Sequence, residues 1–210
     1  STGELIQNLK GHTWYVSSVA VSPDGKYVIS GSFDKNIIIW DLKTGELVNT
    51  LKGHRKEVSS VAISPNGKYL ISGSNDKTIV IWGFNSGEII RTIDGHKKHI
   101  TSVVVSSDGK YIVSGSNDKS VKVWETTTGR YVRLLEGNTW WVLSVAVSPD
   151  SNYVISGSLD GKVKIWDLKT GELVRTNERH RKEVNSITIS PDCKYIASGS
   201  DDRTIKILEM

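Results

Sequence analysis

The stretch GHTWYVSSVAVSPDGKYVISGSFDKNIIIWD, residues 11–41, returns in recognisable form four more times along the chain. It opens with a Gly-His pair and closes with a Trp-Asp pair. Its opening slot recurs every 42 residues, at Gly11-His12, Gly53-His54, Gly95-His96, Gly137-Asn138 and Arg179-His180. A fixed period in this range is typical of repeat architectures, whose units pack on their neighbours. Five such units account for all 210 residues, so we predict a single domain spanning residues 1–210.

Each unit contains four short segments with strand character, separated by turn residues. In the first unit these segments are residues 16–22, 27–32, 37–40 and 46–51. The third segment, IIIW, is apolar at four successive positions, which favours a strand covered on both faces. Stacking four-stranded sheets face to face around an axis covers both faces of each sheet. We therefore predict an all-β fold, a five-bladed β-propeller of four-stranded antiparallel blades.

The first ten residues have the sequence of a repeat's end rather than of its beginning. STGELIQNLK, residues 1–10, aligns with KTGELVNTLK, residues 43–52. We expect this N-terminal strand to complete the last blade and close the ring, because closure removes exposed strand edges. Each of five blades would then turn by about 72°. We expect a monomer; two copies exchanging edges, or a fragment of a longer propeller, are the alternatives.

Composition limits the possible partners. The net charge is +4, with both signs interspersed, whereas a nucleic-acid footprint is usually denser and one-sided. No apolar run approaches the roughly 20 residues of a membrane span, so we expect no membrane partner. Cys193 is the single cysteine, which favours a reducing compartment, and we expect a cytoplasmic protein. Two turn glycines are replaced, by Ser151 and Cys193, and we expect modest backbone strain there if φ is positive.

The recurring Gly-His, Ser-Gly-Ser-x-Asp and Trp-Asp motifs resemble those of the WD-repeat β-propeller family across all five units. The resemblance implies a buried hydrogen-bond network of His, Ser, Asp and Trp in each blade. The corresponding sets are His12, Ser30, Asp34 and Trp40; His54, Ser72, Asp76 and Trp82; His96, Ser114, Asp118 and Trp124. The fourth set has Asn138 with Ser156, Asp160 and Trp166, and the fifth has His180, Ser198 and Asp202 with Leu208. Since Leu208 lacks an indole N–H, we expect the fifth network to be the weakest.

Catalytic and metal-binding interpretations fit the sequence less well. Ser, His and Asp could form a catalytic triad, but an active site is normally built once, and this set recurs in every unit. His96 and His99 lie three residues apart without an evident third metal ligand. No phosphate-binding glycine loop is present, and Cys193 has no histidine beside it. We expect no enzyme activity, metal or cofactor.

The informative positions are those that vary while the scaffold repeats. They follow each Gly-His slot and precede each turn Asp, and the resemblance places both on the top face of the ring. The first and fourth units are apolar there and the others are charged or polar. The predicted partner-binding residues are Trp14, Tyr15, Phe33, Glu57, His99, Trp140, Trp141, Leu143, Leu159 and Glu183. Some of these rings could instead pack between blades.

Large aromatic residues ringed by charged residues are typical of a protein-binding surface. We therefore expect a non-enzymatic scaffold that binds a peptide or protein segment on the top face. The alternative is RNA or single-stranded nucleic acid, bound by the basic pairs with Trp stacking. These pairs are Arg55-Lys56, Lys97-Lys98 and Arg181-Lys182. The neighbouring Glu57 and Glu183 argue against it. A sugar ligand would also suit stacked aromatic rings, but no residue pattern selects it.

Overall fold

A computed structural model describes residues 3–178 and 180–210, and in these ranges the chain forms strands and turns without a helix. The strands form five antiparallel sheets, which we call blades 1 to 5. Blade 1 comprises β1 (Val16–Val21), β2 (Tyr27–Ser32), β3 (Asn36–Asp41) and β4 (Leu47–Lys52). Blade 2 comprises β5 (Val58–Ile63), β6 (Tyr69–Ser74), β7 (Thr78–Gly83) and β8 (Ile89–Asp94).

The other blades repeat this order. Blade 3 comprises β9 (Ile100–Val105), β10 (Tyr111–Ser116), β11 (Val121–Glu125) and β12 (Tyr131–Leu135). Blade 4 comprises β13 (Val142–Val147), β14 (Tyr153–Ser158), β15 (Val163–Asp167) and β16 (Leu173–Asn177). Blade 5 has β17 (Val184–Ile189), β18 (Tyr195–Ser200) and β19 (Ile205–Glu209) only. Arg179, in the glycine slot of the fifth repeat, and Ser1 and Thr2 lie outside the described residues.

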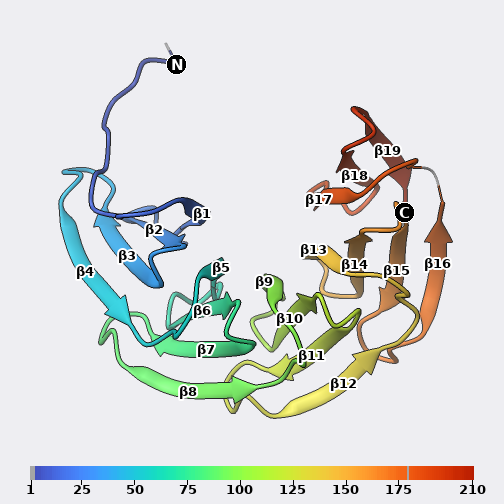
Figure 1. Ribbon diagram of the computed structural model, residues 1–210, viewed down its shortest axis with the longest axis horizontal. Coiled ribbons are helices and arrows are strands. Elements are labelled where there is room, and N and C mark those ends of the chain that lie inside the picture. Colours follow the sequence, from blue (N-terminus) through green and yellow to red (C-terminus); the bar gives the residue numbers. More distant parts are fainter. Residues whose placement is uncertain (1–2, 179) are drawn as a thin grey trace.

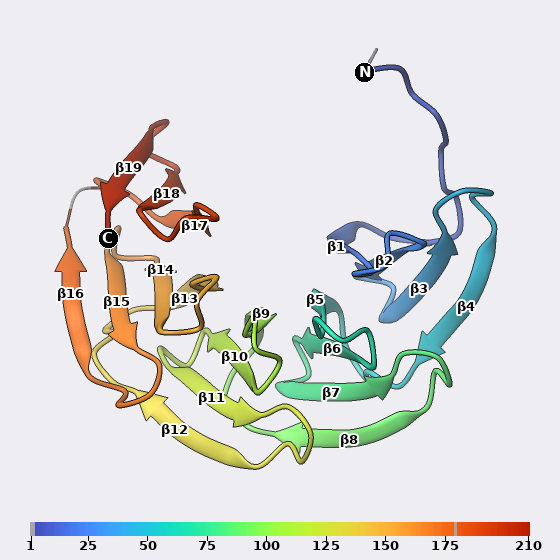
Figure 2. The same ribbon diagram turned by 180° about the vertical axis from the view of Figure 1, so that it is seen from behind.

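The blades stand side by side in an open arc (Figure 1). The first strand of each blade lines the inner side, and the fourth strands of blades 1 to 4 form the outer side (Figure 2). Blade 5 lies at one end of the arc and blade 1 at the other, and a gap separates them in both views. The all-β architecture of stacked antiparallel blades predicted from the 42-residue period is therefore confirmed.

The hydrophobic core lies between neighbouring blades. Within the described residues it consists of four clusters, one at each of the four blade–blade interfaces. Between blades 1 and 2, for example, Ile37 and Ile39 of β3 pack with Val58 and Val61 of β5. This arrangement explains the continuous apolar run of the third strand, because one of its faces packs within the preceding interface and the other within the following one.

The prediction that residues 1–10 close the ring is wrong for this structure. Residues 3–15 form no strand, Leu5 and Ile6 are exposed, and blade 5 has three strands. The physical reason lies in the interfaces, where bulky Ile, Val and Trp side chains from both blades fill the space. Since five blades packed in this way leave a gap, the mean rotation from one blade to the next is smaller than the 72° or so that a closed ring of five requires (Figure 1).

The expected strain at the replaced turn glycines is confirmed. Ser151 and Cys193 have φ angles of 59° and 60°, close to the 68° of Gly25 in the same turn of blade 1. A second left-handed position went unnoticed in the sequence. It follows the turn Asp of every repeat, and its occupants are Lys35, Lys77, Lys119, Gly161 and Arg203, with φ between 69° and 78°.

Candidate interaction surface

The His-Ser-Asp-Trp network forms as predicted in blades 1, 2 and 3. In blade 2, His54 Nδ1 lies 2.9 Å from an Asp76 carboxylate oxygen, and Nε2 lies 2.7 Å from the Ser72 hydroxyl. Trp82 Nε1 donates to the same hydroxyl at 2.8 Å. Since an ionised carboxylate can only accept, Nδ1 carries the hydrogen that faces Asp76. The network thus joins the loop before β5, the strand β6, the turn after it and the strand β7.

This geometry resembles a catalytic triad, but the serine has no route to a substrate. Ser72 is fully buried and its hydroxyl already contacts both His54 and the Trp82 indole. Ser30 and Ser114 are buried in the same arrangement. His96 contacts Asp118 and Ser114, so one of the two histidines considered for a metal is engaged inside the blade. The network is therefore a structural clamp.

Hydrogen bonds keep the network aspartates of blades 1, 2, 3 and 5 ionised. Partial burial of Asp76 acts to raise its pKa, but the hydrogen bonds from His54, Thr78 and the Arg55 amide outweigh it and lower the pKa well below 3.8. The same balance lowers the pKa of Asp118, where Ser120 replaces the threonine. Each aspartate therefore fixes the loop after its Gly-His slot against the turn before the third strand. The residues that vary among repeats stand directly beside this fixed point.

The expectation that blade 5 has the weakest network is wrong, because blade 4 has lost more. His180 keeps both contacts, to Asp202 at 2.9 Å and to Ser198 at 2.8 Å, so Leu208 removes one donor only. In blade 4 the side-chain amide of Asn138 and the hydroxyl of Ser156 have no hydrogen-bond partner although they are buried. The Trp166 indole donates instead to the Glu136 carbonyl, at 3.2 Å.

Replacing Asn138 with histidine should therefore stabilise the chain. Two new hydrogen bonds, to Ser156 and Asp160, are expected to raise the free energy of unfolding by about 1 to 2 kcal/mol. The control is Asn138→Ala, which removes an unsatisfied amide and should be close to neutral. Urea denaturation measures both variants. A histidine variant no more stable than the alanine variant would show that the fourth network cannot be rebuilt.

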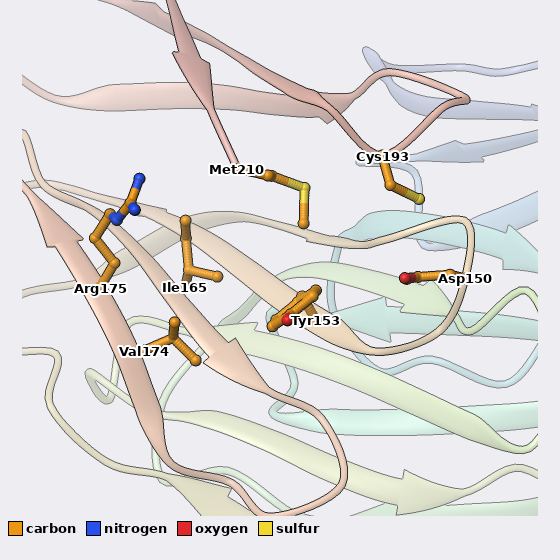
Figure 3. A pocket seen from close by; sticks show the side chains of 7 residues that line it. All are labelled: Asp150, Tyr153, Ile165, Val174, Arg175, Cys193 and Met210. Atoms are coloured by element: carbon orange, nitrogen blue, oxygen red, sulfur yellow. The ribbon is translucent and has the colours of Figure 1, made fainter.

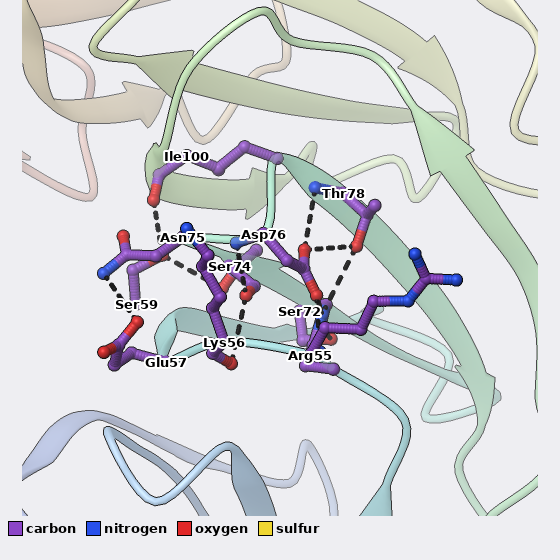
Figure 4. Close-up of polar contacts among 12 residues, drawn as sticks. Arg55, Lys56, Glu57, Ser59, Ser72, Ser74, Asn75, Asp76, Thr78 and Ile100 are labelled. Carbon is purple, nitrogen blue, oxygen red and sulfur yellow. Dashed lines mark hydrogen bonds and ion pairs between the residues drawn. The ribbon is translucent and has the colours of Figure 1, made fainter.

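The structure joins the two predicted rim positions of every blade. In each blade the amide of the residue before the turn Asp donates to the carbonyl of the residue that precedes the first strand. These pairs are Phe33–Tyr15, Asn75–Glu57, Asn117–His99, Leu159–Trp141 and Asp201–Glu183, at 2.9 to 3.1 Å. Figure 4 shows the blade 2 pair, where the Asn75 side chain also reaches the Glu57 carboxylate at 3.4 Å. We call these ten residues the rim.

The predicted aromatic residues form two separate clusters. In blade 1, Tyr15 packs edge-to-face with both Trp14 and Phe33, with ring centroids 6.2 Å apart in each pair, and all three rings are exposed. In blade 4, Trp140 and Trp141 are exposed, whereas Leu143 and Leu159 are half-buried. Blades 2 and 3 lie between the two clusters, and Lys119 of blade 3 stands over the Trp140 ring at 5.6 Å.

The three predicted contact residues with ionisable side chains are less exposed than the aromatic ones. Glu57, His99 and Glu183 are all half-buried. For Glu57, hydrogen bonds from its own amide and from Asn75 outweigh partial desolvation and lower the pKa below its usual value. Glu57 therefore presents a fixed negative charge at neutral pH.

A cavity of about 420 Å³ adjoins the blade 1 cluster. Tyr15 and Phe33 line it from blade 1, and Asn75 lines it from blade 2. Its other lining residues are Val16, Ser17, Ser59, Ile100 and Thr101, so the first strands of blades 1 and 2 and the start of β9 contribute its inner wall. Sequence reasoning selected Leu143 at this first-strand position of blade 4 but missed its counterparts Ser17, Ser59 and Thr101, whose small polar side chains do not stand out within the repeat. This combination of aromatic side chains, hydroxyls and an amide can hold an extended chain by packing and hydrogen bonds.

A second cavity, of about 250 Å³, lies between blades 4 and 5 near Cys193 (Figure 3). It is at the other end of the strands, since β18 separates the Cys193 turn from the rim position Asp201. Met210 and Tyr153 line it, and at the interface between blades 1 and 2 the equivalent residues Phe84 and Tyr27 pack together with ring centroids 5.7 Å apart.

Comparison with known proteins agrees with this architecture. The family model for the WDR3 first beta-propeller domain matches residues 40–210, and the model for the WD domain, G-beta repeat, matches residues 3–41. The chain therefore belongs to the WD-repeat β-propeller family. Proteins of this family are typically scaffolds for protein interaction rather than enzymes.

Similar curated proteins match over single repeats. The nuclear distribution protein PAC1 of Candida albicans is 58% identical over 38 residues, which are 18% of this chain and 8% of that protein. The small ribosomal subunit protein RACK1 of Caenorhabditis elegans is 45% identical over 40 residues, 19% of this chain and 12% of its own length. The chain thus matches only a small part of each relative. Across residues 3–178 and 180–210, the structure offers no helix with the length and apolar character needed to cross a membrane.

Proposed function

We propose that this chain is an interaction scaffold that binds a peptide or protein segment at the rim, with blade 1 as the main contact. The observation that carries the proposal is the exposed Trp14–Tyr15–Phe33 cluster beside the 420 Å³ cavity. Exposed aromatic residues next to a hollow are the usual anchors of protein interfaces.

The surroundings of the cluster suit an extended peptide. Asn75 offers amide groups and Ser17, Ser59 and Thr101 offer hydroxyls along the cavity wall. Glu57, held ionised beside Asn75, favours a segment with a basic residue near its apolar anchor. Trp140 and Trp141 on blade 4 provide a second contact for a longer partner. The single cysteine favours a reducing, cytoplasmic setting for such binding.

Peptide selection tests the proposal. Peptides selected from a random library on the immobilised chain should combine an apolar anchor with a basic residue. Tyr15→Ala should weaken their binding at least tenfold, a change of about 1.4 kcal/mol, because an anchor in contact with two other rings is removed. Adding Trp141→Ala should weaken longer peptides further. Fluorescence anisotropy measures each affinity.

The matched control is Tyr131→Ala, since Tyr131 is an exposed tyrosine on the outer strand β12. It should leave peptide affinity unchanged, and circular dichroism should show that both variants stay folded. Equal affinity of the wild type and Tyr15→Ala for every selected peptide would contradict the assignment of blade 1 as the contact.

Binding of single-stranded RNA is the second candidate, because the three basic pairs next to the rim are exposed. RNA binding predicts an affinity that falls steeply as salt rises. Peptide binding anchored by Tyr15 should change little over the same salt range. A salt titration of both probes therefore separates the two functions.

A further inference from the structure

The two ends of the arc carry the two halves of an interface that occurs four times inside it. At each internal interface the glycine of the Ser-Gly-Ser motif faces an aliphatic residue at the start of the next blade. A Cβ built on the glycine would lie 3.5 Å from Val58 Cβ at Gly31, 3.4 Å from Ile100 Cβ at Gly73 and 3.4 Å from Val142 Cβ at Gly115. Gly199 of blade 5 has the same strand position, and nothing lies within 4 Å of it.

The two end faces expose side chains that the interior interfaces bury. Val16 and Val19 of blade 1 are 52% and 67% exposed, whereas their counterparts Val58 and Val61 are buried in the interface. Ile205 and Ile207 of blade 5 are 76% and 62% exposed. Their counterparts in blade 1, Ile37 and Ile39, are buried. Each end therefore presents the side chains that an adjoining blade covers elsewhere in the arc.

The polar contacts of the interface are also in register at the two ends. A serine in the first strand of each blade accepts a hydrogen bond from an amide in the next blade. The pairs are Ser18–Val61, Ser60–Val103, Ser102–Val145 and Ser144–Ile187, at 3.1 to 3.3 Å. Ser186 takes this position in blade 5, and the amide that the period assigns to it is that of Val19. The end faces of blades 5 and 1 therefore match each other in their hydrogen-bonding groups as well as in their apolar side chains.

The N-terminal segment already lies where the fourth strand of a preceding blade would lie. The Gln7 side chain donates to the Lys43 carbonyl at 3.0 Å and stands against Gly45. One blade interface further on, Asn49 of β4 stands against Gly87, and later Arg133 of β12 stands against Gly171 and donates to the Lys169 carbonyl. Gln7 therefore anchors the N-terminal segment beside blade 1, in the position that Asn49 and Arg133 take in the fourth strands of blades 1 and 3.

We propose that two copies of this chain bind head to tail, with blade 5 of one copy packed on blade 1 of the next. Residues 5–9 of the second copy then pair with β19 of the first, as Leu47–Leu51 pair with β3. A second copy is the occupant because blades 1 and 5 of one arc stand apart across the gap (Figure 2). A heterologous interface of this kind forms a closed ring or an open chain of copies.

Disulfide cross-linking tests the register. In a Cys193→Ser background, Val16→Cys in one copy and Gly199→Cys in another should form an intermolecular disulfide. The internal counterparts have Cβ–Cβ distances of 3.4 to 3.5 Å at three interfaces, close to the range of about 3.5 to 4.5 Å that a disulfide needs. Mixing the two variants, one with a size tag, should give a cross-linked heterodimer under mild oxidation. The control variant carries Ile90→Cys, at an exposed position on blade 2, in place of Val16→Cys, and it should form no cross-linked heterodimer.

The double variant Val16→Cys/Gly199→Cys separates a second copy from ring closure within one chain. Covalent multimers of the 23.2 kDa chain support the proposal. A disulfide closed within a single chain overturns it in favour of a self-closed ring, and the absence of both products overturns the pairing itself.

Sedimentation equilibrium of the wild type gives a second measurement. Its mass should rise above 23.2 kDa with concentration. Val19→Asp, which places a charge on the open face of blade 1, should shift the chain to the monomer. Ile90→Asp, at a comparably exposed site on an interior blade, should leave the assembly unchanged. A constant mass of 23.2 kDa for the wild type would overturn the proposal.

Discussion

Trp82→Ala is expected to lower the free energy of unfolding by about 3 to 5 kcal/mol. Trp82 is 1% exposed and belongs to the cluster between blades 1 and 2. Its indole donates to Ser72 and packs edge-to-face on His54, with centroids 6.2 Å apart. The substitution therefore creates a cavity in the interface and removes a donor from the network. Urea denaturation followed by circular dichroism measures the loss.

Trp141→Ala provides the matched control, because the same side chain is removed from the exposed rim of blade 4. Its free energy of unfolding should stay within about 0.5 kcal/mol of the wild-type value. If the two tryptophan variants lost equal stability, the distinction between interface core and rim would be wrong.

Local features of this chain are well specified by its sequence. The Ser-Gly-Ser motif and the apolar run before Trp40 predict β2 and β3, and the observed bounds differ from the prediction by at most one residue at each end. Each of these features depends on residues within one period. The His-Ser-Asp-Trp network could be placed for the same reason in blades 1, 2 and 3.

Closure could not be predicted in this way, because it depends on the sum of four interface angles. The alignment of residues 1–10 with 43–52 marks this segment as the end of a repeat, but residues 3–10 form no strand in the structure, and the alignment does not say which blade they would join. A small change in packing at each interface opens or closes the ring. The loss in blade 4 was also hidden, since whether an Asn138 amide can reach Ser156 depends on the loop path rather than on residue type.

The Ser-Gly-Ser glycines give a direct comparison between an interior interface and an open end. Gly115→Ala is expected to destabilise the chain by about 1 to 3 kcal/mol. A Cβ there would lie 2.7 Å from Val142 Cγ1 and 3.0 Å from Val145 Cγ1, and both valines are buried. To relieve these short contacts, blades 3 and 4 would have to separate, and the hydrophobic cluster between them would open.

Gly199→Ala places the same methyl group at the same strand position of blade 5, where nothing lies within 4 Å. In dilute solution it should be neutral or stabilise the chain by about 0.5 to 1 kcal/mol, because alanine has less conformational freedom in the unfolded state. Thermal unfolding of both variants at low concentration measures the contrast. If both variants lost the same stability, Gly199 would already be covered by another blade under those conditions. If Gly115→Ala lowered the stability and Gly199→Ala did not, the face of blade 5 would be open and the cost at Gly115 would come from the packing of blade 4.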